Sequence, residues 1–187
     1  MQTAARTNVG RVVFCCWWEA YFTGAFPDGE PLDVYLVDDK AKTPLRLDSP
    51  GADRVFHDFG RAVGNLVGAG KQVFVILSAP YCPAWSPETV PRTSVHLSNT
   101  NRLGILRTEF ESFVLPVETR LIAVVEANGG KIINPRNAMD EGGFFYGRTA
   151  DGTFRYMDDN HMRPFYVNEN AAFLDALLDV RSTGGSN

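Results

Sequence analysis

Long hydrophobic runs are missing from this sequence, and their absence argues against a membrane-spanning helix. No apolar run in the 187 residues approaches the ~18 that a span needs. The first ten residues, MQTAARTNVG, contain no apolar core of a signal peptide. Basic residues are scattered rather than gathered in a stripe, and the net charge is −4. We therefore expect neither a membrane span in this chain nor nucleic acid as a partner.

Cysteine is scarce as well, because the chain holds only Cys15, Cys16 and Cys82. None of them belongs to a CxxC motif or to a Cys/His cluster with zinc-ligand spacing. Asp38 and Asp39 resemble a metal-binding pair only superficially, since no third ligand is spaced near them. We interpret the neighbouring Cys15 and Cys16 as small apolar residues of a strand, and we expect no metal site.

The chain does contain an ordinary globular composition, with 44% hydrophobic and 21% charged residues. That balance and the length predict a single domain over residues 1–187, ending in a flexible tail at 181–187. Apolar runs predict buried strands at 11–17, 72–80 and 131–135, and helical periodicity predicts helices that begin at Asp53 and Pro116 and a last one over 172–178. Further expected elements are a strand at 33–37, a short helix at 104–113 and a hairpin around Asp151-Gly152 with arms at 144–146 and 153–156.

The alternation of strands and helices favours an α/β fold with a mainly parallel sheet. Ligands of such sheets bind outside the carboxyl ends of the strands. Those ends carry Trp18-Glu19, residues 78–82 and residues 134–136, and His161 lies on a loop that could join the same edge. Trp18, Glu19 and Cys82 are therefore candidates for a substrate pocket, although a tryptophan at a strand end is more often part of the core.

Asp158 stands three residues before His161 in the stretch YMDDNHMRP. A carboxylate beside an imidazole can accept a hydrogen bond from one ring nitrogen and stabilise the imidazolium that forms when the other takes a proton. Histidine is the side chain best suited to move protons near neutral pH. The same pattern is typical of a surface turn closed by an Asx-type bond from Asp158 or Asn160, and the sequence leaves both interpretations open. We interpret His57 and His96 as solvent-exposed.

An Asp–His pair of this kind needs a serine or cysteine nucleophile, and the sequence offers poor candidates. Ser78 ends a strand before Ala-Pro, without a following helix N-terminus that could form an oxyanion hole. Cys82 lies between Tyr81 and Pro83, where no electropositive surroundings are evident to activate its thiol. We expect Cys82 to be an inert loop thiol, and a Cys82-dependent hydrolase is the weaker alternative.

The stretch YMDDNHMRPFYV, followed by FLDALL, resembles the last block of SGNH (GDSL-type) hydrolase-like domains. It is most similar to the SGNH domain fused C-terminally to the membrane acyltransferase domain of the bacterial acyltransferase-three family. Three further stretches agree with that domain in order, namely RVVFCCWWEAYF, GKQVFVILSAP and GGKIINPRNAM. Together these stretches extend the resemblance over residues 11–178.

The resemblance implies a flavodoxin-like, three-layer fold with Asp158 and His161 as acid and base of a Ser-His-Asp triad. For Trp18, the resemblance implies only a place in the substrate pocket. The implied activity is O-acyl transfer or ester hydrolysis on acyl esters of cell-surface carbohydrates, in the periplasm or outside the cell, with no cofactor. The implied partners are this carbohydrate or acyl-ester substrate and, if the chain is a truncated part of a longer one, the membrane acyltransferase domain of the same parent chain.

Two features of the family are missing from this sequence. The nucleophile of the family belongs to a Gly-Asp-Ser motif on an earlier strand, and no Gly-Asp-Ser occurs here. Many relatives also carry a cysteine pair in the region that corresponds to residues 136–155, which has none. We therefore expect an N-terminally incomplete SGNH-like domain that lacks its first strand, has an open apolar edge at 11–17 and is inactive alone. The alternative is a non-catalytic module that binds carbohydrate or acyl groups.

Overall fold

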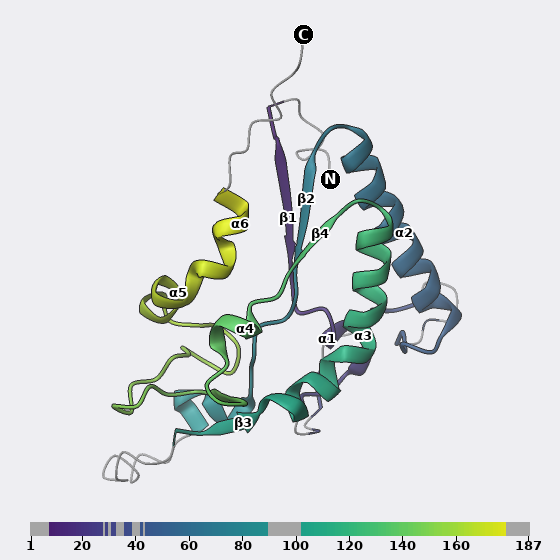
Figure 1. Cartoon of the computed structure of the whole chain (residues 1–187). Helices are drawn as coiled ribbons and strands as arrows, with labels where there is room; N and C mark the ends of the chain where they lie inside the picture. Colours follow the sequence, from purple (N-terminus) through teal and green to yellow (C-terminus); the bar gives the residue numbers. More distant parts are fainter. Residues whose placement is uncertain are drawn as a thin grey trace.

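Three parallel strands form the main sheet of the protein (Figure 1). The computed structural model describes residues 8–27, 29, 31–32, 36–38, 42, 44–89 and 102–178. The strand order is β1 (Arg11–Cys15), β2 (Gln72–Ile76) and β4 (Lys131–Ile133), with Arg11 opposite Gln72 and Phe74 opposite Lys131. Helices form the crossovers between these parallel strands, so the predicted α/β fold with a parallel sheet is confirmed.

The central strand β2 is buried on both faces, whereas β1 is not. Residues 73–75 of β2 are at most 3% exposed, as a continuous apolar run predicts. In β1 the side chains alternate, and Val13 is 42% exposed while Cys15 is exposed too. Among the described strands, only β2 pairs with β1. The prediction of a strand buried on both faces at 11–17 is therefore wrong for β1, because Val12 and Phe14 pack on the side of α2 while Val13 and Cys15 stay exposed on the other face.

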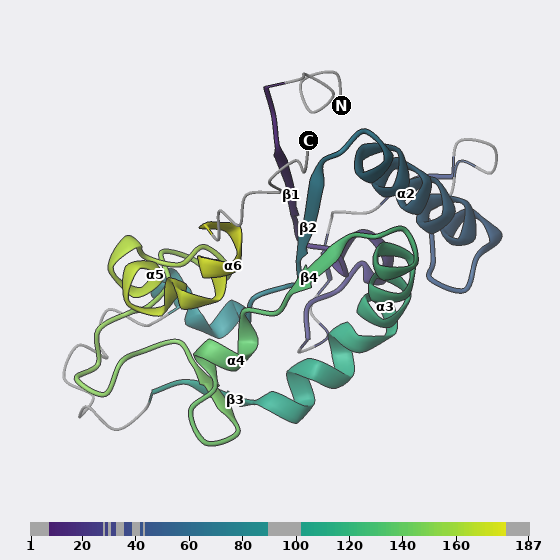
Figure 2. The same cartoon turned by 45° about the horizontal axis from the view of Figure 1, so that its top comes forward.

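Two long helices, α2 (Pro50–Gly68) and α3 (Arg107–Ala127), cover one face of the sheet (Figure 2). The first begins where the Ser49 side chain accepts a hydrogen bond from the Ala52 backbone N–H, with a proline in its first turn. The helices approach closely at Gly60, because a Cβ atom there would lie 2.6 Å from a Val124 methyl carbon. The core beneath them consists of Phe22, Ala52, Phe56, Val75, Leu77, Val117, Leu121 and Val125.

Pro116 lies inside α3, so the prediction that a helix begins at this residue is wrong. The short helix expected at 104–113 is instead the first part of the same helix. A proline removes one backbone N–H donor and usually interrupts a helix. Here the helix continues because the residues on both sides of the proline belong to one buried stripe. The stripe consists of Phe110, Val114, Val117, Leu121 and Val125.

The C-terminal segment lies across the sheet from α2 and α3 (Figures 1 and 2). It consists of α5 (Pro164–Asn170), the 3-10 turn η4 (Ala171–Leu174) and α6 (Asp175–Leu178). The Arg11 side chain ties this segment to β1, since its Nη1 donates to the Leu177 carbonyl at 2.5 Å. The helix expected over 172–178 is thus divided between η4 and α6. The expected tail at 181–187 lies outside the described residues, as do residues 33–35 of the strand expected at 33–37.

A second sheet pairs β3 (Gly104–Leu106) with β5 (Phe144–Tyr146) in antiparallel fashion. After β5 the chain turns back, so that Arg148 forms a β-bridge with Phe154 and Tyr156 forms another with Met162. The expected turn at 151–152 is therefore present, but the arm at 144–146 pairs with β3 instead of with 153–156. We call residues 144–163 the ribbon. It carries Asp158 and His161 near its end.

Short elements complete the structure: α1 (Ala20–Thr23), η1 (Pro83–Trp85), η2 (Pro87–Thr89) and α4 (Arg136–Met139). The helix α1 follows the end of β1, the two 3-10 turns follow β2, and α4 follows β4. These connections therefore leave from the carboxyl edge of the sheet. In the described ranges, no helix combines the length and the apolarity that a bilayer crossing requires.

Candidate active site

Asp158 and His161 form a hydrogen-bonded pair inside one tight turn. The His161 Nδ1 atom lies 2.8 Å from Asp158 Oδ2. The other carboxylate oxygen, Oδ1, accepts hydrogen bonds from the backbone N–H groups of Asn160 at 3.0 Å and of His161 at 2.7 Å. The Met157 N–H closes the turn by donating to the His161 carbonyl at 2.7 Å. The Asx-type turn and the Asp–His pair, which the sequence leaves as alternatives, are therefore one structure.

The turn favours an ionised Asp158 beside an accessible imidazole. Partial burial acts to raise the pKa of Asp158, but the backbone N–H groups of Asn160 and His161 and the imidazole outweigh it, so the pKa is lowered. The side chains of His161 and Asp158 are 70% and 47% exposed. In the neutral ring, a carboxylate that accepts from Nδ1 leaves Nε2 as the proton acceptor. The geometry therefore suits a general base that faces solvent.

Tyr156 anchors this turn to the core. The residue is 2% exposed, its ring packs against Trp85 with centroids 4.7 Å apart, and its hydroxyl donates to the Pro80 carbonyl at 2.7 Å. Arg163 adds a hydrogen bond from its Nε to the Tyr156 carbonyl at 3.1 Å. Burial holds the pKa of Tyr156 well above its ordinary value, so the hydroxyl remains a donor. An exposed turn thus has a fixed attachment to the fold.

The loop after β2 contacts the same turn. The Cys82 backbone N–H donates to the Asp159 carbonyl at 3.1 Å. The structure therefore brings residues 78–82 together with the loop of His161, at the carboxyl edge of the sheet. The residue Cys82 is only 9% exposed and lies in a hydrophobic cluster with Tyr156. A thiol buried among apolar side chains is a poor nucleophile, which weighs against a Cys82-dependent hydrolase.

Ser78 and Glu19 bind each other at this edge, below the surface. The Ser78 hydroxyl donates to Glu19 Oε2 at 2.5 Å, and both residues are buried. The Ser78 N–H donates to Glu118 Oε1 at 3.1 Å, and its carbonyl accepts from Arg136 Nη1 at 2.9 Å. Every polar group of Ser78 is therefore engaged inside the protein, and its hydroxyl is not presented to a substrate.

Glu118 and Arg136 complete this buried network. Arg136 Nη1 and Nη2 contact the two Glu118 carboxylate oxygens at 2.8 and 2.6 Å. The pair links α3 to the start of α4, just beyond β4, so polar groups join the carboxyl ends of all three parallel strands. Glu118 is not among the residues predicted for this edge. Its place four residues after Val114 and three before Leu121, on the buried stripe of α3, is the signal that could have revealed it.

Glu19 is fully buried, and its surroundings disfavour its charge. Burial is the largest influence and raises the pKa of Glu19, while the hydroxyls of Ser78 and Tyr81 act in the opposite direction. The Tyr81 hydroxyl acts on Glu19 without reaching hydrogen-bond geometry. Glu19 Oε1, Tyr81 Oη and Trp17 Nε1 are buried atoms without a hydrogen-bond partner in the described part of the chain. Glu19 therefore belongs to the interior of the sheet edge and not to the wall of an open pocket.

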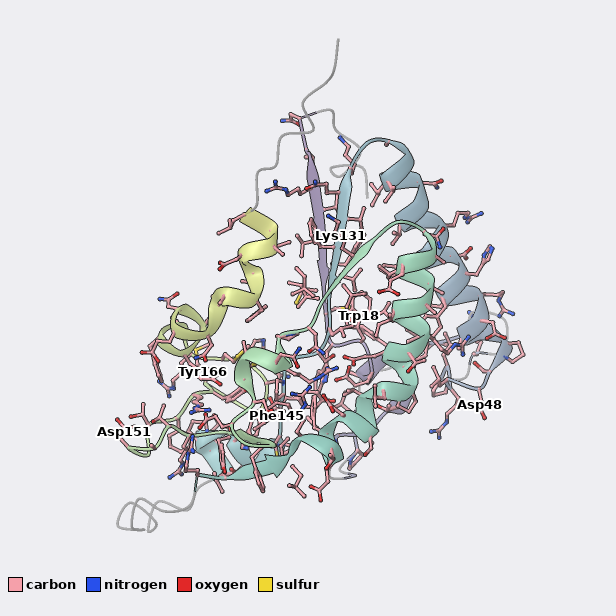
Figure 3. All side chains as sticks on the ribbon, in the orientation of Figure 1. Trp18, Asp48, Lys131, Phe145, Asp151 and Tyr166 are labelled. Atoms are coloured by element: carbon pink, nitrogen blue, oxygen red, sulfur yellow. The ribbon has the colours of Figure 1, made fainter. Side chains whose placement is uncertain are left out.

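The two tryptophans at the end of β1 face opposite sides. Trp18 donates from Nε1 to the Ile76 carbonyl at 2.8 Å and packs against α2, between the sheet and the helices (Figure 3). Trp17 packs against Tyr81, with ring centroids 4.7 Å apart, beside the cluster that contains Tyr156. The structure thus brings Trp17, rather than Trp18, to the side of the Asp–His turn. Alternation along a strand predicts that neighbours face opposite sides, but not which of them faces a site.

The other two histidines are not part of this arrangement. His57 lies on α2 with a 76% exposed side chain, and its Nδ1 is 3.4 Å from the Asp58 carboxylate. Its predicted exposure is confirmed, whereas His96 lies outside the described residues. Within the ranges that the structure describes, no three His, Cys, Asp or Glu side chains gather in a way that could hold a metal ion.

An Asp–His pair beside the carboxyl ends of a parallel α/β sheet is an arrangement typical of hydrolases. The chain matches the protein family described as SGNH domain (fused to AT3 domains) over residues 1–174. It therefore belongs to this family, and the family predicted from the sequence is confirmed. The chain thus carries an SGNH-type domain of the acyl-transfer and esterase class. No curated protein and no solved structure shows a significant match.

Proposed function

We propose that this chain carries the acid–base part of a site for O-acyl transfer or ester hydrolysis on acylated carbohydrates. The observation that carries the proposal is the 2.8 Å contact between His161 Nδ1 and Asp158 Oδ2 in an exposed turn. His161 Nε2 takes the proton of an attacking hydroxyl and later returns it to the leaving group. Asp158 holds the ring and stabilises the imidazolium that exists between the two steps. Family membership supports these roles.

The attacking serine is not found among the described residues. The described serines are Ser49, Ser78, Ser86 and Ser112. Each has its hydroxyl engaged with another part of the protein, and none contacts the His161 ring. The whole sequence contains no Gly-Asp-Ser. We therefore propose that a serine on another polypeptide segment completes the site, and that these 187 residues form no acyl-enzyme by themselves.

The proposed setting follows from the same family. Its members are described as fused to AT3 domains, so the proposed neighbour of this domain is a membrane acyltransferase. The proposed substrates are acyl esters of cell-surface carbohydrates, reached outside the cytoplasmic membrane. Residues 1–187 would act as a single domain in this setting.

A serine-reactive phosphonate tests whether the nucleophile is missing. The purified chain is incubated with the probe, and every labelled serine is identified by peptide mass spectrometry. We expect no serine to be labelled strongly, whereas an active serine esterase treated in parallel should be labelled to completion. Robust labelling at one serine of this chain would overturn the proposal that the serine comes from elsewhere.

A second experiment tests the acid–base pair itself. A Gly-Asp-Ser segment from a complete member of the family, expressed together with this chain, should provide a serine that reacts with the phosphonate. The labelling rate should fall about a thousandfold in His161→Ala. It should stay unchanged in His57→Ala, which removes an exposed histidine that also has a neighbouring carboxylate. Equal rates in the two variants would show that His161 is not the base.

A further inference from the structure

Two arginine side chains lie over aromatic rings along the ribbon. The Arg148 guanidinium lies 4.1 Å from the centroid of the Phe154 ring, and the Arg102 guanidinium lies 3.8 Å from that of Tyr146. Arg148 and Phe154 face each other across a β-bridge. Arg102 Nε donates to the Arg148 carbonyl at 3.4 Å, so the two arginines are neighbours. Each cationic group is therefore held over its own aromatic ring, on neighbouring residues.

Positive charge exceeds negative charge in this group of residues. It contains the guanidinium groups of Arg102, Arg148 and Arg155 and a single carboxylate, that of Glu141. Arg102 and Arg155 each contact Glu141 at 2.5 Å. Arg148 has no ion pair and no side-chain hydrogen bond in the described part of the chain, and its Nε atom is buried. Residues 90–101, which lead directly into Arg102, contain no aspartate or glutamate.

Asp151, the acidic residue of the nearby turn, is engaged with other groups. Its Oδ1 accepts hydrogen bonds from the Thr149 hydroxyl and the Thr153 N–H. It lies at the outer tip of the turn, as Figure 3 shows. Arg148 thus remains a half-buried charge without a counterion among the described residues. Partial removal of a charge from water is costly, and an anion from a ligand would offset that cost.

We propose that Arg148, supported by Arg102, binds the carboxylate of an acidic saccharide. A guanidinium stacked on a ring keeps its N–H edge in a fixed plane, which matches the two oxygens of a carboxylate. Phe144 is 37% exposed and stacks on Tyr146 with centroids 5.8 Å apart, so it adds an apolar surface for a sugar ring. That the carboxylate belongs to a saccharide rests on the proposed function, whereas the excess of positive charge does not.

The position of this surface suits a ligand that also reaches His161. Phe154 precedes Asp158 by four residues on the ribbon, so their backbones lie at most about 13 Å apart. The segments between them are hydrogen-bonded to their neighbours, since the Arg155 N–H donates to Gly147 and the Arg163 N–H donates to Arg155. An acidic sugar can therefore be held at Arg148 while an ester on a nearby sugar of the same carbohydrate lies at His161.

Calorimetric titration with trigalacturonate and with its neutral methyl ester tests this site without any acyl donor. At an ionic strength of about 50 mM, where charge pairing is weakly screened, the acid should bind the wild-type chain. It should bind about tenfold more weakly to Arg148→Gln, and the ester should bind weakly to both chains. Arg148→Lys keeps the charge but loses the planar fork, so its affinity should lie between the two.

The matched control is Arg61→Gln, which removes an exposed arginine of α2 that pairs with Asp58 at 3.2 Å. This variant should bind the acid as the wild-type chain does. Equal affinity for acid and ester, unchanged affinity in both Arg148 variants, or no binding of the acid would each overturn the proposal. None of these results depends on a serine or on His161, so the saccharide site and the acid–base role fail in separate experiments.

Discussion

The Ser78 hydroxyl donates a 2.5 Å hydrogen bond to the Glu19 carboxylate, and this bond joins the chain after β1 to the chain after β2. Ser78 is 5% exposed and Glu19 is fully buried. Through its backbone, Ser78 also contacts Glu118 and Arg136. The strand ends are thus held by an internal polar network, and the exposed Asp–His turn lies beside it. The buried network therefore stabilises the fold at this edge, whereas the Asp–His turn is exposed to solvent.

Replacing Ser78 by alanine should lower the free energy of unfolding by about 2 kcal/mol, because a buried carboxyl group loses a hydrogen bond. Urea unfolding followed by circular dichroism measures the change. The control is Ser112→Ala, which removes an exposed hydroxyl that donates to the Glu109 carbonyl in the same helix. It should cost less than about 0.5 kcal/mol. If both variants lose equal stability, the Ser78–Glu19 hydrogen bond stabilises the fold no more than an exposed one does.

Replacing Glu19 by glutamine should change how stability depends on pH. Burial raises the pKa of Glu19 above its ordinary 4.5, so the folded chain holds this proton more tightly than the unfolded chain. The stability that the tighter proton binding by Glu19 contributes is fully present below the pKa of Glu19 in the unfolded chain. It is lost as the pH rises through the pKa of Glu19 in the folded chain. Glutamine has no proton to lose, so the variant should gain stability relative to the wild type over that window.

Urea unfolding of both chains, measured between about pH 4 and pH 8, follows this difference. The difference in the free energy of unfolding should grow in favour of Glu19→Gln and then level off. Groups with lowered pKa values, such as Asp158 and Glu141, affect both chains alike and cancel. A difference that stays constant with pH would argue against a raised pKa at Glu19.

Replacing Glu118 by glutamine should be strongly destabilising. The change removes the close carboxylate partner of the buried Arg136 guanidinium and leaves only Glu111, whose Oε1 lies 3.7 Å from Arg136 Nε, so it should cost about 3 kcal/mol. Asp58→Asn, which breaks the exposed contact with Arg61, should cost less than about 1 kcal/mol. The double variant Glu118→Leu/Arg136→Met should be more stable than Glu118→Gln, because it removes both charges of the pair and leaves neither of them uncompensated. Guanidinium chloride unfolding of the wild-type chain and the three variants measures these free energies. Similar losses of stability in Glu118→Gln and Asp58→Asn would show that the Glu118–Arg136 pair has no special weight.

The parallel sheet was predictable from the sequence because each strand is a local signal. Residues 72–76 form a continuous apolar run, and such a run is typical of a strand with a neighbour on each side. The pairing of β3 with β5 was not predictable, because strands of three residues carry too few positions for a periodic pattern. The continuous helix α3 was missed for a different reason. Pro116 is a strong local stop signal, and the buried stripe on both sides of it overrides that signal.

The Asp–His contact was predictable because it forms between residues three positions apart. The buried network was not, since its members come from four separate segments of the chain and meet only in the folded protein. Glu118 carried a signal, as a carboxylate at a core position of a helix, and Arg148 carried none. An arginine shows its lack of a partner only when the positions of all nearby carboxylates are known.

Asp158 uses both of its carboxylate oxygens within the four residues 158–161. The orientation of the imidazole therefore depends on short-range chain geometry and on neither a nucleophile nor a bound substrate. If this pair is the proposed proton-transfer unit, it stays assembled without a serine beside it. Under the proposed function, catalytic competence then depends on whether a serine is supplied, while the turn itself needs no rebuilding.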